Sequence, residues 1–172
     1  MLTVRRPRRW PAMAVAGAVA FALTACSGGI VPTKTMTLDQ ATARAEQVVK
    51  ETAAALTPQP QLDFDPSIGN DSGVCLAEIP NASQMVSVDR TAWLRKIPTS
   101  QNDSIGRQIL AYWKKQGYSI SDQSGFADGQ PSIGGETKDG FTISLATAKN
   151  GWMSISASSP CVYQHGTPPS GT

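Results

Sequence analysis

Histidine is almost absent from this 172-residue chain, which contains only His165, close to prolines and glycines near the C-terminus. A serine hydrolase needs a histidine held in a fixed position, and such a stretch is a poor place for one. The GxSxG, P-loop, HExxH and dinucleotide-binding motifs are also missing. We therefore predict that the protein is not an enzyme, with no catalytic residue, metal or cofactor.

Long hydrophobic runs are missing as well. The uncharged apolar run Ala12–Ala25 has 14 residues, whereas a transmembrane helix needs about 20. Four arginines precede this run and small residues end it, as in a secretory signal. Leu23-Thr24-Ala25-Cys26 resembles the bacterial lipobox, whose cysteine sulfur receives a diacylglycerol before cleavage. We predict a lipoprotein signal peptide at residues 1–25 and a lipid anchor on Cys26; a plain secretory signal with an incidental Cys26 is the alternative.

Cleavage before Cys26 would leave 147 residues, an ordinary size for one domain. Residues 26–36 are small and polar, and we expect them to form the lipidated cysteine and its tether. Residues 37–164 are predicted to form a single domain and residues 165–172 a flexible tail. The lipid anchor would hold this domain at the extracytoplasmic face of the cell membrane, and Arg5-Arg6 leaves open whether export is general secretory or twin-arginine.

Positive charge is scarce in the predicted mature chain. Without the four arginines of the signal, 11 basic residues remain against 13 acidic ones, a formal charge of −2. Adjacent basic residues occur only at Arg95-Lys96 and Lys114-Lys115. Nucleic-acid-binding domains carry a basic stripe and a clearly positive charge, so we predict no nucleic-acid partner.

Cysteine is equally scarce, with three residues in the chain. If Cys26 carries lipid, Cys75 and Cys161 remain, and export places them where disulfides form. A bridge between them would close a loop of about 87 residues and stabilise the fold by ~4–5 kcal/mol in the chain-entropy model. Two free or metal-binding thiols are the alternative, but no CxxC motif accompanies them. We predict the disulfide.

Helical periodicity marks two stretches. Thr37–Leu56 carries an apolar stripe, with Thr37 as the N-cap and Gln40 at the capping-box position. Asp103–Gln116 carries the second stripe, and Ser100 or Asn102 is expected to open that helix.

Alternating apolar residues and turn signals predict strands in the rest of the chain. Asp139-Gly140 and Asn150-Gly151 are strong hairpin signals, and the glycines and prolines of Val162–Thr172 predict a frayed end. Two helices packed on a mainly antiparallel sheet give an α+β two-layer sandwich. The predicted strands are Gln61–Asp65, Val74–Ala77, Gln84–Trp93, Tyr118–Ser124, Ser132–Thr137, Phe141–Thr147 and Trp152–Ala157.

Several short segments follow one another in a distinctive order. They are the lipobox, the helix ending near Pro58, Leu62-Asp63-Phe64-Asp65-Pro66, Gly73-Val74-Cys75, Gly117-Tyr118, Asp139-Gly140-Phe141 and Ser159-Pro160-Cys161. This order resembles the LppA-like lipoproteins of mycobacteria and related actinobacteria, and the resemblance covers most of Thr37–Gln164. It implies an envelope lipoprotein anchored at Cys26 with a Cys75–Cys161 bridge, and it implies no catalytic residue.

The favoured functional hypothesis is a binding or adaptor domain. Its sheet, or the Gly125–Pro131 loop, would contact an envelope protein, lipid or glycan, because loops carried on a rigid sheet are common recognition sites. Phe126 lies in this glycine-rich loop and is the aromatic residue that we expect to be exposed. A place in the core is its alternative.

The second hypothesis is a small envelope hydrolase that uses paired carboxylates. Asp63 with Asp65, or Asp89 with Glu78, are the pairs that the sequence offers. Acidic residues on strands are more often solvated surface groups. The spacing of Asp63, Asp65 and Asp71 does not match an EF-hand loop, so we predict no calcium site.

Overall fold

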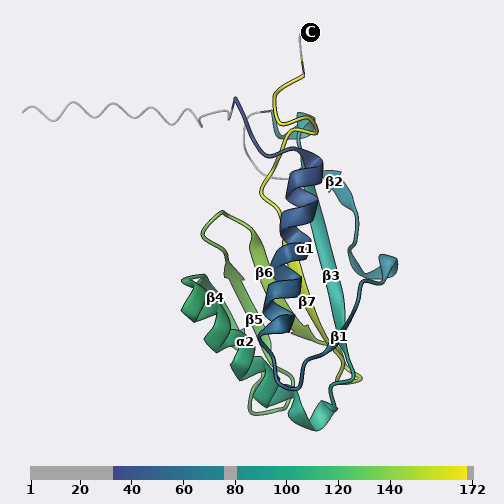
Figure 1. Cartoon of the computed structure of the whole chain (residues 1–172), viewed down its shortest axis with the longest axis vertical. Helices are drawn as coiled ribbons and strands as arrows, with labels where there is room; N and C mark the ends of the chain where they lie inside the picture. Colours follow the sequence, from purple (N-terminus) through teal and green to yellow (C-terminus); the bar gives the residue numbers. More distant parts are fainter. Residues whose placement is uncertain (1–32, 76–80, 170–172) are drawn as a thin grey trace, which may run out of the picture.

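The computed structural model describes residues 33–75 and 81–169, in which two α-helices and seven strands form an α+β fold, as predicted (Figure 1). Three short 3-10 turns, η1 (Pro66–Ile68), η2 (Ala82–Gln84) and η3 (Thr99–Gln101), connect them. The main elements are α1 (Leu38–Ala54), β1 (Gln61–Asp63), β2 (Ser72–Val74), β3 (Val86–Arg95), α2 (Asn102–Gln116), β4 (Ser119–Ser124), β5 (Ser132–Glu136), β6 (Thr142–Thr147) and β7 (Met153–Ser158).

The strands form one antiparallel sheet in the order β1-β3-β7-β6-β5-β4, and β2 pairs with the first part of β3. Both predicted hairpins, β5–β6 and β6–β7, are present. Gly140 and Gly151 in their turns have φ of +83° and +81°, a backbone conformation that glycine adopts without strain. The strand predicted at Val74–Ala77 begins earlier, at Ser72, and its last two residues lie outside the described ranges.

The capping box of α1 is confirmed. The Gln40 amide donates to Thr37 Oγ1 at 3.2 Å, and the Thr37 amide donates to Gln40 Oε1 at 3.0 Å. α2 begins at Asn102, one of the two residues predicted to open it, but neither of them caps the helix. Ser100 lies in η3, and Asn102 is the first residue of the helix, where its side chain donates to the carbonyls of Gly129 and Gly151. Asn102 therefore ties two loops together instead of capping the helix.

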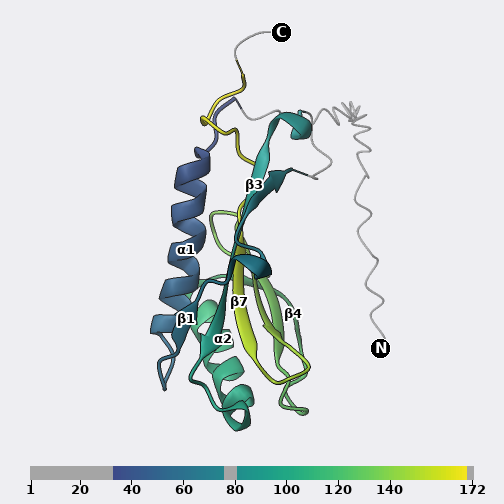
Figure 2. The same ribbon diagram turned by 90° about the vertical axis from the view of Figure 1, so that its right-hand side faces the viewer.

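The main core lies on one face of the sheet, between the strands and both helices (Figure 2). The central strands β5, β6 and β7 and the last part of β3 alternate, so that their apolar residues meet the helices and the residues between them face the other way. No helix of the described chain covers that other face, which we call the open face. The buried residues of the core are Ala45, Val48, Val49, Leu56, Ala92, Leu94, Ile105, Ile109, Trp113, Ile133, Phe141, Ile143, Leu145, Met153, Ile155 and Ala157.

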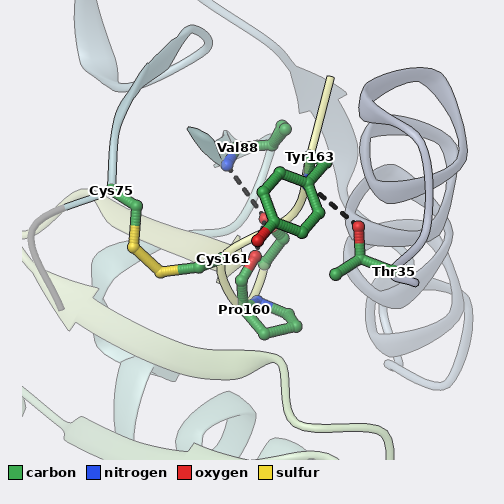
Figure 3. Close-up of a disulfide and its surroundings, with 7 residues drawn as sticks. Thr35, Cys75, Val88, Pro160, Cys161 and Tyr163 are labelled. Atoms are coloured by element: carbon green, nitrogen blue, oxygen red, sulfur yellow. Dashed lines mark hydrogen bonds between the residues drawn. A yellow bond between two sulfur atoms is a disulfide. The ribbon is translucent and has the colours of Figure 1, made fainter. Parts of the chain in front are cut away.

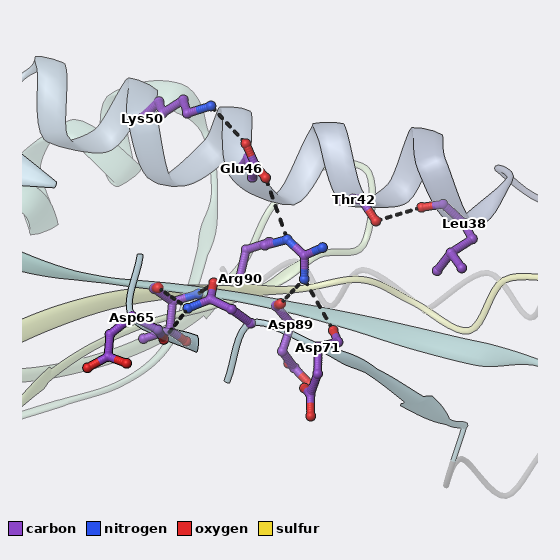
Figure 4. A network of polar contacts seen from close by, with 10 residues as sticks. Leu38, Thr42, Glu46, Lys50, Asp65, Asp71, Asp89 and Arg90 are labelled. Atoms are coloured by element: carbon purple, nitrogen blue, oxygen red, sulfur yellow. Dashed lines mark hydrogen bonds and ion pairs between the residues drawn. The ribbon is translucent and has the colours of Figure 1, made fainter. Parts of the chain in front are cut away.

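Arg90 of β3 connects α1 to the edge of the sheet (Figure 4). Its Nε lies 3.6 Å from Glu46 Oε1 on the helix, and its Nη1 donates to the carbonyl oxygens of Asp89 and Asp71. Lys50 forms a second ion pair with Glu46 at 2.8 Å. The Lys50 hydrogen bond is the main reason that the pKa of the Glu46 carboxyl is lowered.

The two ends of the described chain are tied together beside the disulfide (Figure 3). The Cys75–Cys161 bridge is present, with the α-carbons 5.7 Å apart, as predicted. The Thr35 amide donates to the Gly166 carbonyl at 2.8 Å, and the Tyr163 amide donates to Thr35 Oγ1 at 2.9 Å. Because Val162 and Tyr163 are buried, the predicted frayed end does not begin at Val162, and the backbone contacts extend to Gly166.

Candidate binding site

Two tryptophans stand at one end of the open face. Trp93 belongs to β3, and Trp152 directly precedes β7. Their neighbours Leu94 and Met153 are buried in the core, so strand alternation turns both indoles outward. Trp93 is half-buried, whereas Trp152 leaves 50% of its surface in solvent, a large exposed fraction for this residue.

Arg95 of β3 joins the two indoles. Its guanidinium carbon lies 4.4 Å from the centroid of the Trp152 ring and 5.3 Å from that of Trp93, within cation–π range. The two indoles are 6.1 Å apart and meet edge to face at 76°. Asp63 of β1 accepts a hydrogen bond from Arg95 Nε at 2.9 Å, and Arg95 Nη2 lies 2.9 Å from the same carboxylate oxygen. We call these residues, Asp63, Trp93, Arg95 and Trp152, the indole–guanidinium cluster.

A floor of small side chains continues from the cluster across β7 and β6. Ser154 lies opposite Trp93 in the register of β3 and β7, and Ser156 lies opposite Ser144 in that of β6 and β7. Thr91 Oγ1 is 2.8 Å from Ser156 Oγ, so these two hydroxyl groups form a hydrogen bond between β3 and β7. Because these side chains are short, the indoles project above a shallow polar surface.

The sequence analysis missed this cluster and chose Phe126 as the exposed aromatic residue. That expectation of exposure is wrong: Phe126 is half-buried and packs against the main core, with the Arg107 guanidinium 5.1 Å from its ring centroid. The loop can approach α2 this closely because Gly106 has no side chain there. The exposure of Trp152 could have been predicted from the alternation of side chains along the strand. If Met153 and Ile155 point into the core, Trp152 must point outward.

The paired carboxylates of the hydrolase hypothesis have separate partners. Asp63 is paired with Arg95, whereas Asp65 accepts hydrogen bonds from the Ser67 amide and hydroxyl, which lower the pKa of the Asp65 carboxyl. Asp89 accepts a hydrogen bond from the Ser158 hydroxyl, and Glu78 lies outside the described ranges. Within those ranges no group of three or more histidine, cysteine, aspartate or glutamate residues could hold a metal ion.

A second polar network lies between α1 and the β5–β6 turn. Arg44 Nε donates to Asp139 Oδ2 at 2.8 Å, and this hydrogen bond lowers the pKa of the Asp139 carboxyl and raises the pKa of Arg44. Burial raises the pKa of the Tyr112 and Tyr118 hydroxyls beside it. These contacts hold the helix against the sheet, away from the indole–guanidinium cluster.

The surface cavities of the described chain include the following two. One, of about 410 Å³, lies beside the bulge of β4 and is lined by Lys114 and Ile120. The other, of about 380 Å³, is lined by Tyr163, His165 and Pro168 near the C-terminal segment, and His165 itself is exposed. Neither cavity gathers a nucleophile, a base and a positioning group, as a catalytic site would.

Two sequence predictions cannot be placed in this structure. Cys26 and the signal peptide lie outside the described ranges. In the part of the chain that is described, neither helix has the length and apolar character of a membrane span.

Comparison with known proteins gives no relative: no family model, no curated protein and no solved structure matches the chain. The resemblance to LppA-like lipoproteins therefore stays a prediction.

Proposed function

We propose that this protein is a lipid-anchored binding domain of the cell envelope, and that the indole–guanidinium cluster is its binding site. One observation carries this proposal: Trp152 keeps half of its surface in solvent although Arg95 lies 4.4 Å from its ring. Removing an exposed indole from water is favourable, and tryptophan and arginine are the residues that most often dominate binding energy.

The two ends of β3 support a membrane-distal location for the site. Val86 begins the strand beside Val162, near the tied ends of the domain, and Arg95 ends it. Ten residues of strand separate these ends by roughly 30 Å. The nine residues from Cys26 to Thr35 would reach at most about 30 Å. A lipid on Cys26 would thus hold the tied end near the membrane and present the cluster outward.

Capture from the native envelope tests this function. Lipidated wild-type protein would be cross-linked in its own membranes, purified, and its bound material analysed for both protein and sugar. Trp152→Ala should reduce the captured material at least about tenfold, because it removes the exposed anchor. Val74→Ala is the matched control, since Val74 is 61% exposed but lies on β2 at the opposite end of β3. Equal capture by wild type and Trp152→Ala would contradict the proposed site.

A further inference from the structure

We propose that the indole–guanidinium cluster binds an uncharged glycan chain, an inference that rests on the binding function proposed above. Three properties of the cluster favour such a ligand: a half-exposed indole, a compensated charge and the shallow hydroxyl floor beside it.

The exposed part of the Trp152 indole suits a sugar ring. A pyranose has a flat face of C–H groups with partial positive charge, surrounded by hydroxyls, and the face of an indole carries partial negative charge. Arg95 lies over the Trp152 ring at 4.4 Å, yet half of the Trp152 surface remains exposed. Trp93, 6.1 Å away and almost perpendicular, braces the ring edge to face. The exposed part of Trp152 therefore offers a braced apolar surface to a sugar ring.

The charge of the cluster favours an uncharged ligand. Arg95 and Asp63 compensate each other through two contacts of 2.9 Å, so the site presents no net charge to an anion or a cation. A guanidinium has five N–H donors and a carboxylate has about four acceptor positions. The N–H donors and acceptor positions that the ion pair does not use are available to the hydroxyl groups of a sugar. Each sugar hydroxyl can both donate and accept a hydrogen bond.

The surroundings of the cluster fit a glycan better than a protein partner. The centre of a protein interface is largely apolar, and its anchor residues are ringed by contacts that exclude water. Here the floor is built of Ser154, Ser156 and Ser144, with Ala146 opposite Ser154. Trp152 and Val74 are the exposed large hydrophobic residues of the described chain, and they lie at opposite ends of β3.

The extent of the floor points to a chain of sugars. The distance from β3 across β7 to β6 is two strand spacings, roughly 10 Å, and the row Thr91, Ser156 and Ser144 places a hydroxyl side chain on each of the three strands. One ring on Trp152 would leave most of this surface uncovered. We therefore expect a hexasaccharide to bind at least about tenfold more tightly than a monosaccharide, through the added contacts on the floor.

Nuclear magnetic resonance of the indole N–H groups provides a direct test. The mature lipoprotein contains three tryptophans, and Trp113 is an internal reference, because it is fully buried and its Nε1 donates to Thr52 at 3.0 Å. Wild-type protein in detergent would be titrated with uncharged hexamers of β-1,4-linked N-acetylglucosamine, β-1,4-linked glucose and α-1,4-linked glucose. At least one hexamer should shift the Trp93 and Trp152 signals and leave that of Trp113 in place.

Two variants separate binding from folding. Trp152→Ala should weaken hexamer binding at least about tenfold. Ser154→Leu keeps both indoles but blocks the floor beside Trp93, and it should weaken binding to a similar extent. An unchanged Trp113 signal in each variant reports an intact core, and Val74→Ala should bind like wild type.

The outcomes distinguish this inference from the proposed function. If no uncharged hexamer moves the Trp93 and Trp152 signals, the glycan inference is wrong. Envelope capture of a protein that depends on Trp152 would then still support a binding domain with another class of ligand. Capture that does not depend on Trp152 would overturn both proposals.

Discussion

The side-chain amide of Asn70 pairs with the backbone of Thr91 as a neighbouring strand would. Asn70 Nδ2 donates to the Thr91 carbonyl at 2.9 Å, and the Thr91 amide donates to Asn70 Oδ1 at 3.1 Å. This position on the edge of β3 falls between the residues that pair with β1 and those that pair with β2. One side chain thereby completes the edge of the strand that carries Trp93 and Arg95.

Replacement of Asn70 should destabilise the fold. Asn70→Ala leaves the amide and carbonyl of a nearly buried residue, Thr91, without these partners, and we expect a loss of about 2 kcal/mol or more in the free energy of unfolding. Asn70→Asp keeps the acceptor but places a carboxylate oxygen where the amide donates to the carbonyls of Asp65 and Thr91, so its loss at neutral pH should be at least as large. Urea denaturation of the three proteins measures the effect. A loss below about 0.5 kcal/mol in Asn70→Ala would contradict the proposed role.

The contact between Trp113 and Thr52 joins the two helices inside the core. Both residues are fully buried, and the indole Nε1 donates to Thr52 Oγ1 at 3.0 Å. Thr52→Val preserves the shape but leaves the indole N–H unpaired, which should cost about 1–3 kcal/mol. Thr52→Ser keeps the hydroxyl, and its smaller loss should come from the missing methyl group. Equal stability of Thr52→Val and wild type in chemical denaturation would show that this hydrogen bond is dispensable.

The Arg44–Asp139 pair predicts a contribution to acid sensitivity. The pKa of Asp139 in the folded state lies below its ordinary value of 3.8, chiefly because Arg44 donates a hydrogen bond to it. The stabilisation is therefore complete above the unfolded pKa and is lost as the pH falls through the folded pKa. Asp139→Asn should lose less stability than wild type between about pH 5 and about pH 2. Parallel curves for wild type and Asp139→Asn would refute the prediction.

Most of the fold could be predicted from the sequence, because the local capping and turn signals favour the same structure as the packing of the core. Thr37 and Gln40 formed the expected capping box, and the Asp139-Gly140 and Asn150-Gly151 turns formed the expected hairpins. The wrong predictions concern segments whose structure depends on contacts with residues far away in the sequence. The contact of Tyr163 with Thr35 joins residues 128 positions apart, and no local pattern reveals that it orders the C-terminal segment.

The candidate site was harder to predict than the fold. Its residues come from β1, the end of β3 and the start of β7, which the register brings together. The alternation of side chains along a strand implies that Trp152 points outward. That Trp152 lies beside Trp93 cannot be predicted in this way, because it depends on the pairing of β3 with β7. Glycine-rich composition instead directed attention to Phe126, whose ring is held against α2 by a close approach at Gly106. A binding role for Phe126 stays a prediction.

The lipid anchor can be tested independently of the folded domain. Cys26→Ser removes the sulfur to which a diacylglycerol would be attached, so labelling with a fatty-acid analogue should disappear. The mature protein should then leave the membrane or remain as uncleaved precursor, because stable anchoring needs at least two acyl chains. Cys75→Ser removes a different cysteine and should retain the label. Label that persists in Cys26→Ser would contradict the lipobox assignment.

Gly106 shows why a helix-favouring substitution can be destabilising. In an exposed helix interior, replacing glycine by alanine gains about 1 kcal/mol. Here, however, a β-carbon at position 106 would lie 2.7 Å from Cβ of Pro131 and 3.1 Å from Cε1 of Phe126. The Pro131 ring is fixed to its backbone and cannot rotate away, so the loop must move.

We therefore expect Gly106→Ala to destabilise the protein, because overpacking costs about 1–3 kcal/mol and outweighs the gain in helix propensity. Ser104→Ala, on the exposed face of the same helix, is the control and should be neutral or slightly stabilising. A second change, Pro131→Gly, removes both Cβ and Cγ of the obstructing ring, so in the double variant the cost of Gly106→Ala should fall by at least about half, measured as a coupling energy in a double-mutant cycle. Additive effects of the two substitutions would show that the loop does not pack on Gly106.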